Sequence, residues 1–348
     1  MSTGDNYEAA ASKSATDVAR FDRTSDGFVK KMHHALHVTP ALVPLIVLLA
    51  SIAVFGLLLG SRFFSPFALT LILQQVQIVG IVAAAQSLVI LTAGIDLSVG
   101  AIAVISSVVM GQFTFRYGLP AEVAVACGLI FGTLIGTING WLVAVMKLPP
   151  FIVTLGMWQI VLAANFLYSA NETIRSQVIA AEAPLLQLLG VKFNLGGAIF
   201  TLGVVFLLVL VLVLAYVLKH TAWGRHVYAV GDDPDAAELS GVNVKKTIIS
   251  VYAIAGLICA FAGWALIGRI GSVSPTSGQL LNIESITAVV IGGISLFGGR
   301  GSILGTFFGA LIVGVFTLGL RLAGADAQWT YLLIGVLIIA AVAVDQWI

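Results

Sequence analysis

The side chains that could do chemistry are few, and their positions argue against most enzymatic mechanisms. All five histidines lie in polar stretches, at His33, His34, His37, His220 and His226. The apolar stretches contain no Ser–His pair, no His-Glu-x-x-His zinc motif and no Asp-rich metal motif. Because such groups supply the general bases and metal ligands of hydrolytic mechanisms, we predict no catalytic residue and no metal site.

The sequence also lacks a phosphate-binding loop of the form Gly-x-x-x-x-Gly-Lys-[Ser/Thr]. The chain therefore does not bind ATP in that manner, and we predict no cofactor. Two carboxylates, Asp96 and Glu284, lie near the ends of apolar stretches. Asp96 sits between two glycine-flanked helix ends. It could cap the helix that begins near residue 97, with Ser98 beside it, or serve a function of its own.

The composition indicates which elements must hold these residues. Only 9% of the residues are charged and 59% are hydrophobic, with a mean hydropathy of +1.07, whereas a soluble domain has about 25% charged residues. A soluble fold of this length could not hide so much apolar surface. We therefore predict an all-α, polytopic membrane helix bundle. The net charge of +1 gives no reason to expect a nucleic-acid partner.

A helix needs about 20 apolar residues to cross the hydrocarbon core, and this length predicts about ten spans. They lie near residues 41–60, 69–92, 97–114, 121–146, 150–169, 198–218, 248–268, 284–298, 302–320 and 329–345. Very short glycine-containing turns join spans 2 and 3 and spans 8 and 9, so that one or more of these spans could be broken or re-entrant. Gly128, Gly132 and Gly136 repeat every four residues and predict close helix packing.

The polar tail and the basic residues predict the orientation. Residues 1–40 are polar and lack the apolar core of a signal peptide, and residues 41–348 form the membrane domain. With the tail in the cytoplasm, 11 of the 17 Lys and Arg residues fall on the cytoplasmic side, as the positive-inside rule requires. We predict a multi-pass protein with both termini in the cytoplasm. The cluster around Lys30 and Lys31 could contact anionic lipid headgroups.

The long polar loop between spans 6 and 7, residues 219–247, encodes a short helix. Asp233 is a suitable N-cap and Pro234 suits the first helical position, while Gly241 can end the helix in a left-handed conformation. Asn243 can then cap span 7. A helix of about two turns at the membrane surface is suited to docking in a groove of a partner protein, although a solvated connector would look similar.

Three segments together resemble a known family. They are Gly94–Gly100 (Gly-Ile-Asp-Leu-Ser-Val-Gly), the loop Gly224–Asn243, and Ile291–Gly301 (Ile-Gly-Gly-Ile-Ser-Leu-Phe-Gly-Gly-Arg-Gly). In this order they are similar to the permease subunits of bacterial ATP-binding-cassette (ABC) importers for ribose, xylose, galactose and fructose. The resemblance covers nearly everything from about residue 40 and is strongest for fructose importers, although the tail is longer than in ribose permeases. Within this chain, Thr92–Gly100 also resembles Ile291–Gly299 at an offset of 199 residues, which could mark an internal repeat or arise by chance.

The resemblance implies a fold like that of type II ABC importers, in the bacterial inner membrane. It implies a homodimer that binds two cytoplasmic ATPase subunits and receives a monosaccharide from a periplasmic binding protein. The family's coupling helix would fall on Asp235, Ala236, Ala237, Glu238, Leu239, Ser240 and Gly241. A self-contained, ion-coupled sugar transporter is the alternative, but such carriers usually display more intramembrane carboxylates or broken-helix ion sites.

A sugar pathway needs hydrogen-bonding groups and aromatic surface. We predict that it draws on Gln74, Gln77, Asp96, Asn139, Asn165 and Trp158. Buried amides are costly in lipid unless they are paired or face a cavity. Hydrogen bonding between helices is therefore the competing interpretation for these amides, and for Gln75 and Gln86.

Overall fold

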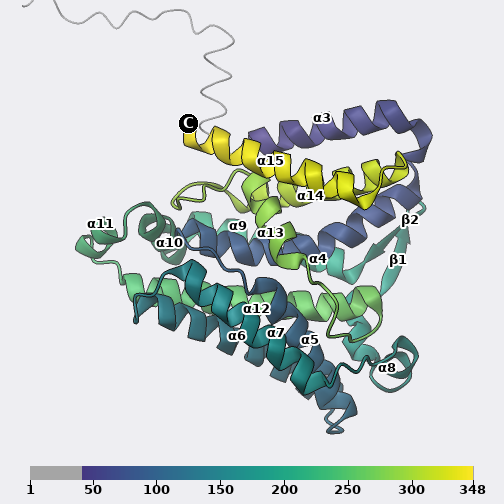
Figure 1. Ribbon diagram of the computed structural model, residues 1–348, viewed down its shortest axis with the longest axis horizontal. Helices are drawn as coiled ribbons and strands as arrows, with labels where there is room; N and C mark the ends of the chain where they lie inside the picture. Colours follow the sequence, from purple (N-terminus) through teal and green to yellow (C-terminus); the bar gives the residue numbers. More distant parts are fainter. Residues whose placement is uncertain (1–40, 348) are drawn as a thin grey trace, which may run out of the picture. The chain divides into compact units, whose positions relative to one another are not determined.

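A computed structural model describes residues 41–347 (Figure 1), and the predicted polar tail lies outside this part of the chain. The predicted all-α membrane bundle is confirmed. Seven described helices are long and apolar enough to cross a membrane: α3 (Leu42–Leu59, continued by the 3-10 turn Gly60–Arg62), α4 (Pro66–Leu91), α6 (Ala121–Ala144), α7 (Pro150–Ser169), α9 (Leu202–His220), α12 (Val244–Ile270) and α14 (Ile303–Leu322). Three further apolar helices accompany them: α5 (Val99–Phe115), α13 (Leu281–Ile291) and α15 (Ala327–Trp347).

The centre of the bundle is α4, whose last sixteen residues, 76–91, are all buried. It packs against α12, α14, α13 and α9. By contrast, α3, α7 and α9 expose many large apolar side chains, among them Leu57, Leu167 and Leu212. This arrangement suits a bundle in a lipid bilayer, because apolar helix faces that contact lipid are not exposed to water.

Glycines bring α6 and α12 into backbone contact, as their spacing predicted. A Cβ atom added at Gly136 would overlap the carbonyl oxygen of Tyr252, and one added at Gly256 would overlap that of Gly132. Gly128 lies close to α5, where an added Cβ atom would overlap the side chain of Met110. Close approach of this kind strengthens van der Waals packing where no hydrophobic effect drives helices together.

The segment predicted as span 8, residues 284–298, is not a full-length span. Its helix α13 has 11 residues, about 16 Å at 1.5 Å per residue, against a hydrocarbon core of about 30 Å. Residues 292–302 then form a glycine-rich turn before α14. In Figure 1, α13 runs steeply across the direction of the long helices. Its break is thus of the kind that the short turn between spans 8 and 9 suggested.

Between α7 and α9 lies a compact cap that the sequence did not predict. It consists of α8 (Ser176–Glu182), the 3-10 helix η2 (Pro184–Gly190) and a hairpin of strands β1 (Lys192–Leu195) and β2 (Ala198–Thr201). The predicted span 198–218 is therefore corrected at its start, because residues 198–201 pair with β1 and the helix begins at Leu202. We call this the hairpin end of the bundle. The opposite end carries α10 (Ala222–Asp232) and α11 (Pro234–Leu239).

Candidate functional site

The predicted short helix exists and is capped as expected. In α11 the carboxylate of Asp233 accepts hydrogen bonds from the backbone N–H groups of Asp235 (2.9 Å) and Ala236 (3.0 Å). Gly241 ends the turn with a left-handed φ of 87°, and the side chain of Asn243 accepts from the N–H of Lys246 (3.0 Å) to begin α12. The sequence missed α10, which precedes α11 and packs on α9 and α12.

The surface of α11 is open. Ala237 is its one buried residue and turns toward the bundle. Leu239, in contrast, is 91% exposed, and Asp235, Ala236, Glu238, Ser240 and Gly241 are exposed as well. Leu239 is thus an exposed apolar side chain at the tip of a polar loop, beside the exposed carboxylates of Asp235 and Glu238.

The second and third segments meet at the C-terminal end of α10, next to the end of α4 that precedes Gly94–Gly100. The N–H of Gly299 donates to the carbonyl of Leu91, the last residue of α4 (3.0 Å). Gly231 lies between them, because a Cβ there would overlap the Leu91 oxygen and lie 2.7 Å from the Gly299 nitrogen. The hydroxyl of Tyr228 donates to the carbonyl of Gly301 (3.0 Å). We call these contacts the three-segment junction.

Burial raises the pKa of the Tyr228 phenol above its ordinary value. The phenol therefore keeps its proton at neutral pH and remains a hydrogen-bond donor. This donor satisfies the Gly301 carbonyl, which belongs to the turn between α13 and α14. The same turn thus receives one hydrogen bond from α10 and donates another to α4.

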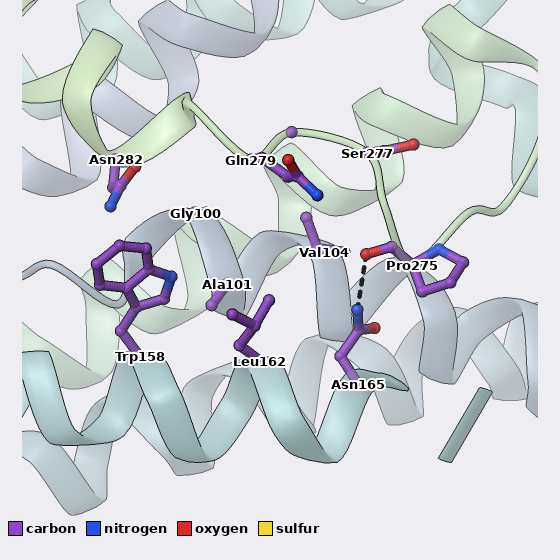
Figure 2. Close-up of a pocket in the computed structure, with 11 residues that line it drawn as sticks. Gly100, Ala101, Val104, Trp158, Leu162, Asn165, Pro275, Ser277, Gln279 and Asn282 are labelled. Atoms are coloured by element: carbon purple, nitrogen blue, oxygen red, sulfur yellow. Dashed lines mark hydrogen bonds between the residues drawn. The ribbon is translucent and has the colours of Figure 1, made fainter. Parts of the chain in front are cut away.

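A pocket lies between α5, α7 and α13 (Figure 2). Its cavity volume is about 20 Å³, room for about one water molecule. The site is therefore a narrow slot. Its lining residues are Gly100, Ala101, Val104, Trp158, Leu162, Asn165, Pro275, Ser277, Gly278, Gln279 and Asn282.

Two predicted pathway residues, Trp158 and Asn165, line this pocket. Asn165 is 1% exposed and donates through Nδ2 to the carbonyl of Pro275 (2.8 Å), while its Oδ1 has no partner. Figure 2 shows the amide nitrogen of Asn282 directed toward the indole of Trp158. The pocket thus offers one aromatic face and several amide groups to a ligand.

Residues 68–342 match the family described as the permease component of branched-chain amino acid transport systems. The chain belongs to this permease family. It is 70% identical, over 98% of its length and 95% of the relative, to the fructose import permease protein FrcC of Rhizobium meliloti. No solved structure matches the chain.

More distant relatives are named as import permeases for other sugars. The ribose import permease protein RbsC of Escherichia coli K12 is 36% identical over 88% of the chain and 92% of the relative. The galactose/methyl galactoside import permease protein MglC of Haemophilus influenzae is 32% identical over 79% and 85%. The predicted family is confirmed. The permease is a multi-pass membrane protein and a transport component rather than an enzyme.

The other predicted pathway residues of the permease lie away from the pocket. Gln77 is fully buried and accepts a hydrogen bond from Thr201 at the hairpin, and Gln74 is half-buried on α4. The neighbouring Gln75 bridges two helix ends, accepting from Arg269 (3.1 Å) and donating to Glu284 (3.4 Å). Gln75 and Gln77 therefore make hydrogen bonds between elements, and a role of Gln77 in the pathway stays a prediction.

Asp96 and Asn139 form a separate buried cluster. One Asp96 oxygen accepts from both the N–H (2.7 Å) and the hydroxyl (2.6 Å) of Ser98, and Asn139 donates to that hydroxyl (3.0 Å). The Gln86 amide, oriented to satisfy both groups, pairs with the N–H and carbonyl of Asp96. Ser98 rather than Asp96 is the N-cap residue of α5. The cap prediction is corrected by two residues, because the carboxylate closes a turn just before the helix.

Sequence reasoning missed two of the pocket's amides, Gln279 and Asn282. Gln279 lies in the turn before α13 and Asn282 in the first turn of that helix, whereas the sequence analysis began span 8 only at residue 284. A polar residue just before an apolar stretch looks like an ordinary loop residue. The signal that could have found them is the clustering of Ser277, Gln279 and Asn282 around Gly278, which marks a turn rather than a span.

Proposed function

We propose that this permease carries fructose, as the membrane subunit of an importer driven by ATP on partner subunits. The high identity to a fructose import permease over almost the whole chain carries the proposal. Ribose and galactose permeases are similar over most of the chain at about half that identity. Fructose is therefore favoured over other monosaccharides.

The pocket supports a neutral, hydroxyl-rich ligand. None of its eleven lining residues is ionisable, whereas an indole and three amides lie among them. A free amino acid carries an ammonium and a carboxylate, and burying these charges without partners is costly. Sugar hydroxyls pair well with amides and backbone groups, and the apolar face of a sugar suits an aromatic ring. We assign Trp158, Asn165, Gln279 and Asn282 to the pathway.

The open face of α11 supports docking of an ATPase subunit. The exposed residues around Leu239 and Glu238 would be the contact, with the α10–α11 end in the cytoplasm. Both chain termini then lie on the cytoplasmic side of the inner membrane. The hairpin end would receive sugar from a periplasmic binding protein. Two copies of the chain would assemble with two ATPase subunits.

Reconstituted vesicles test this function. The permease, its genomic-neighbour ATPase and binding protein are placed in vesicles without an ion gradient, and uptake of labelled fructose is measured with and without ATP. We expect uptake only with ATP, and competition by unlabelled fructose rather than ribose. Uptake driven by a proton or sodium gradient alone would instead establish an ion-coupled carrier. Stronger competition by ribose would reassign the sugar.

A further inference from the structure

The docking helix and the pocket are far apart in sequence, yet one chain of direct contacts joins them. At one end, α11 follows α10 with Asp233 as the only residue between them. At the other end, α13 runs from the glycine-rich turn 292–302 to Asn282 at the pocket. The three-segment junction is where α10 touches that turn.

The contacts at the junction are between backbone atoms and leave little room for one segment to move without the others. Gly231 of α10 packs on Leu91 and Gly299, and a Cβ at Gly299 would lie 2.8 Å from the Cα of Asp232. A Cβ at Gly298 would lie 2.6 Å from the Gly231 carbonyl oxygen and 2.8 Å from the nitrogen of Ala93. Backbone atoms cannot change rotamer to yield. A displacement of α10 must therefore move the turn, the end of α4, or both.

Helix α13 leads into this turn and packs closely on other helices at both of its ends. Gly292, which ends α13, packs on the backbone of Gly305 and Thr306 of α14. Further along α13, the backbone of Asn282 lies against the first turn of α5, 3.1 Å from a Cβ added at Gly100. An 11-residue helix has few ways to bend between these points. Its far end carries the Asn282 amide toward Trp158 (Figure 2).

We propose that Gly231, Gly299 and Tyr228 are coupling residues, through which a push on α11 moves α13 and repositions Asn282 in the pocket. The inference rests on the proposed docking of an ATPase at α11. In this arrangement α10 transmits the movement of α11 to the turn, and α13 carries it from the turn to the pocket. The slot is too narrow for a sugar in the present conformation, so transport requires one of its walls to move. Of its three helices, α13 leads directly into the turn that α10 touches.

Two variants test the coupling against a matched control. Gly231→Ala places a methyl group into the Leu91 carbonyl, whereas Gly335→Ala places one on α15 where nothing lies within 4 Å. Overpacking of this kind weakens a well-packed contact by an amount that corresponds to about tenfold or more in an equilibrium. We expect Gly231→Ala to lose at least about tenfold in ATP-driven uptake, and Gly335→Ala to retain it. Tyr228→Phe removes only the hydrogen bond to Gly301, keeps the ring, and should lose a few-fold.

A spin label reports the movement itself. Both native cysteines are replaced by serine, and Ile283, which is 53% exposed on α13, becomes the labelled cysteine. In the assembled complex, a non-hydrolysable ATP analogue should change the label's mobility in the parent chain and in Gly335→Ala. The change should be absent in Gly231→Ala and reduced in Tyr228→Phe.

The outcomes separate the two proposals. If the parent chain does not co-purify with the ATPase, the docking proposal fails. If the complex assembles but the label responds equally in the parent, Gly231→Ala and Tyr228→Phe, the coupling route is wrong while the docking proposal stands. If Gly231→Ala does not assemble, Tyr228→Phe decides, and an unchanged response there overturns the route.

Discussion

Removal of the cap on α11 gives a quantitative test of the docking helix. Asp233→Ala deletes the acceptor of two backbone hydrogen bonds, from Asp235 at 2.9 Å and Ala236 at 3.0 Å. Loss of an N-cap costs about 1 kcal/mol. Since α11 has six residues and isolated helices shorter than about 12 residues are marginal in water, the cap makes a large contribution to its order.

That energy can be converted to an affinity. About 1 kcal/mol corresponds to roughly fivefold in an equilibrium constant. If the ATPase binds only the ordered helix, its apparent affinity falls by up to the same factor, because apparent affinity scales with the fraction of competent conformer. Titration of labelled ATPase against the permease in lipid nanodiscs measures this. Asp233→Asn keeps an oxygen in the capping position and should bind within twofold of the parent chain.

Two results would refute this reasoning. Unchanged binding of Asp233→Ala would show that the order of α11 does not limit docking. Equal losses in Asp233→Ala and Asp233→Asn would show that the charge contacts the partner and that the cap is incidental. Glu182→Gln is a matched control, because it neutralises an exposed carboxylate on α8 at the hairpin end, away from α11.

Three further changes test packing, the buried cluster and the pocket. Gly136→Ala should destabilise the fold by about 1–3 kcal/mol, since the methyl group would overlap a backbone oxygen of α12; thermal unfolding in detergent measures this, with Gly335→Ala unchanged. Asp96→Leu leaves the N–H and hydroxyl of Ser98 without their acceptor and should cost about 1–3 kcal/mol, more than Asp96→Asn, in the same assay. Trp158→Ala should raise the fructose concentration for half-maximal uptake about tenfold without changing ATPase binding; an unchanged value would remove the pocket from the pathway.

Local chemistry made parts of this structure predictable. The caps of α11 and α12 follow from side chains within three residues of the groups that they satisfy, so Asp233, Gly241 and Asn243 could be read directly. The glycine contacts of α6 were predictable for a related reason. Four-residue spacing places small residues on one helix face, and a second helix can approach such a face closely. The partner helix α12 could not be named, because spacing on one helix says nothing about its neighbour.

Non-local features were beyond the same reasoning. Hydropathy counts Ile294, Leu296 and Phe297 as part of a span, although they belong to a turn that follows an 11-residue helix. The pocket joins Asn165 to Asn282 across 117 positions of sequence, and no periodic pattern connects them. The amides Gln77 and Asn165 looked alike in the sequence. Their neighbours in space distinguish them, because Gln77 meets a strand and Asn165 meets a pocket.

The resemblance between Thr92–Gly100 and Ile291–Gly299 has a physical counterpart. Both segments interrupt apolar helices, and irregular backbone among membrane helices needs partners because lipid offers none. The two interruptions supply them to each other: Gly299 donates to Leu91 just before the first segment, and Gly298 packs on Ala93 within it. The loop Gly224–Asn243 joins this contact through Gly231, which packs on Leu91 and Gly299. An internal repeat and a chance resemblance would both give this arrangement, because each places small residues where two interrupted helices meet. Three motifs that lie far apart in the sequence therefore form one unit, and a substitution in any of them should alter the packing of the other two.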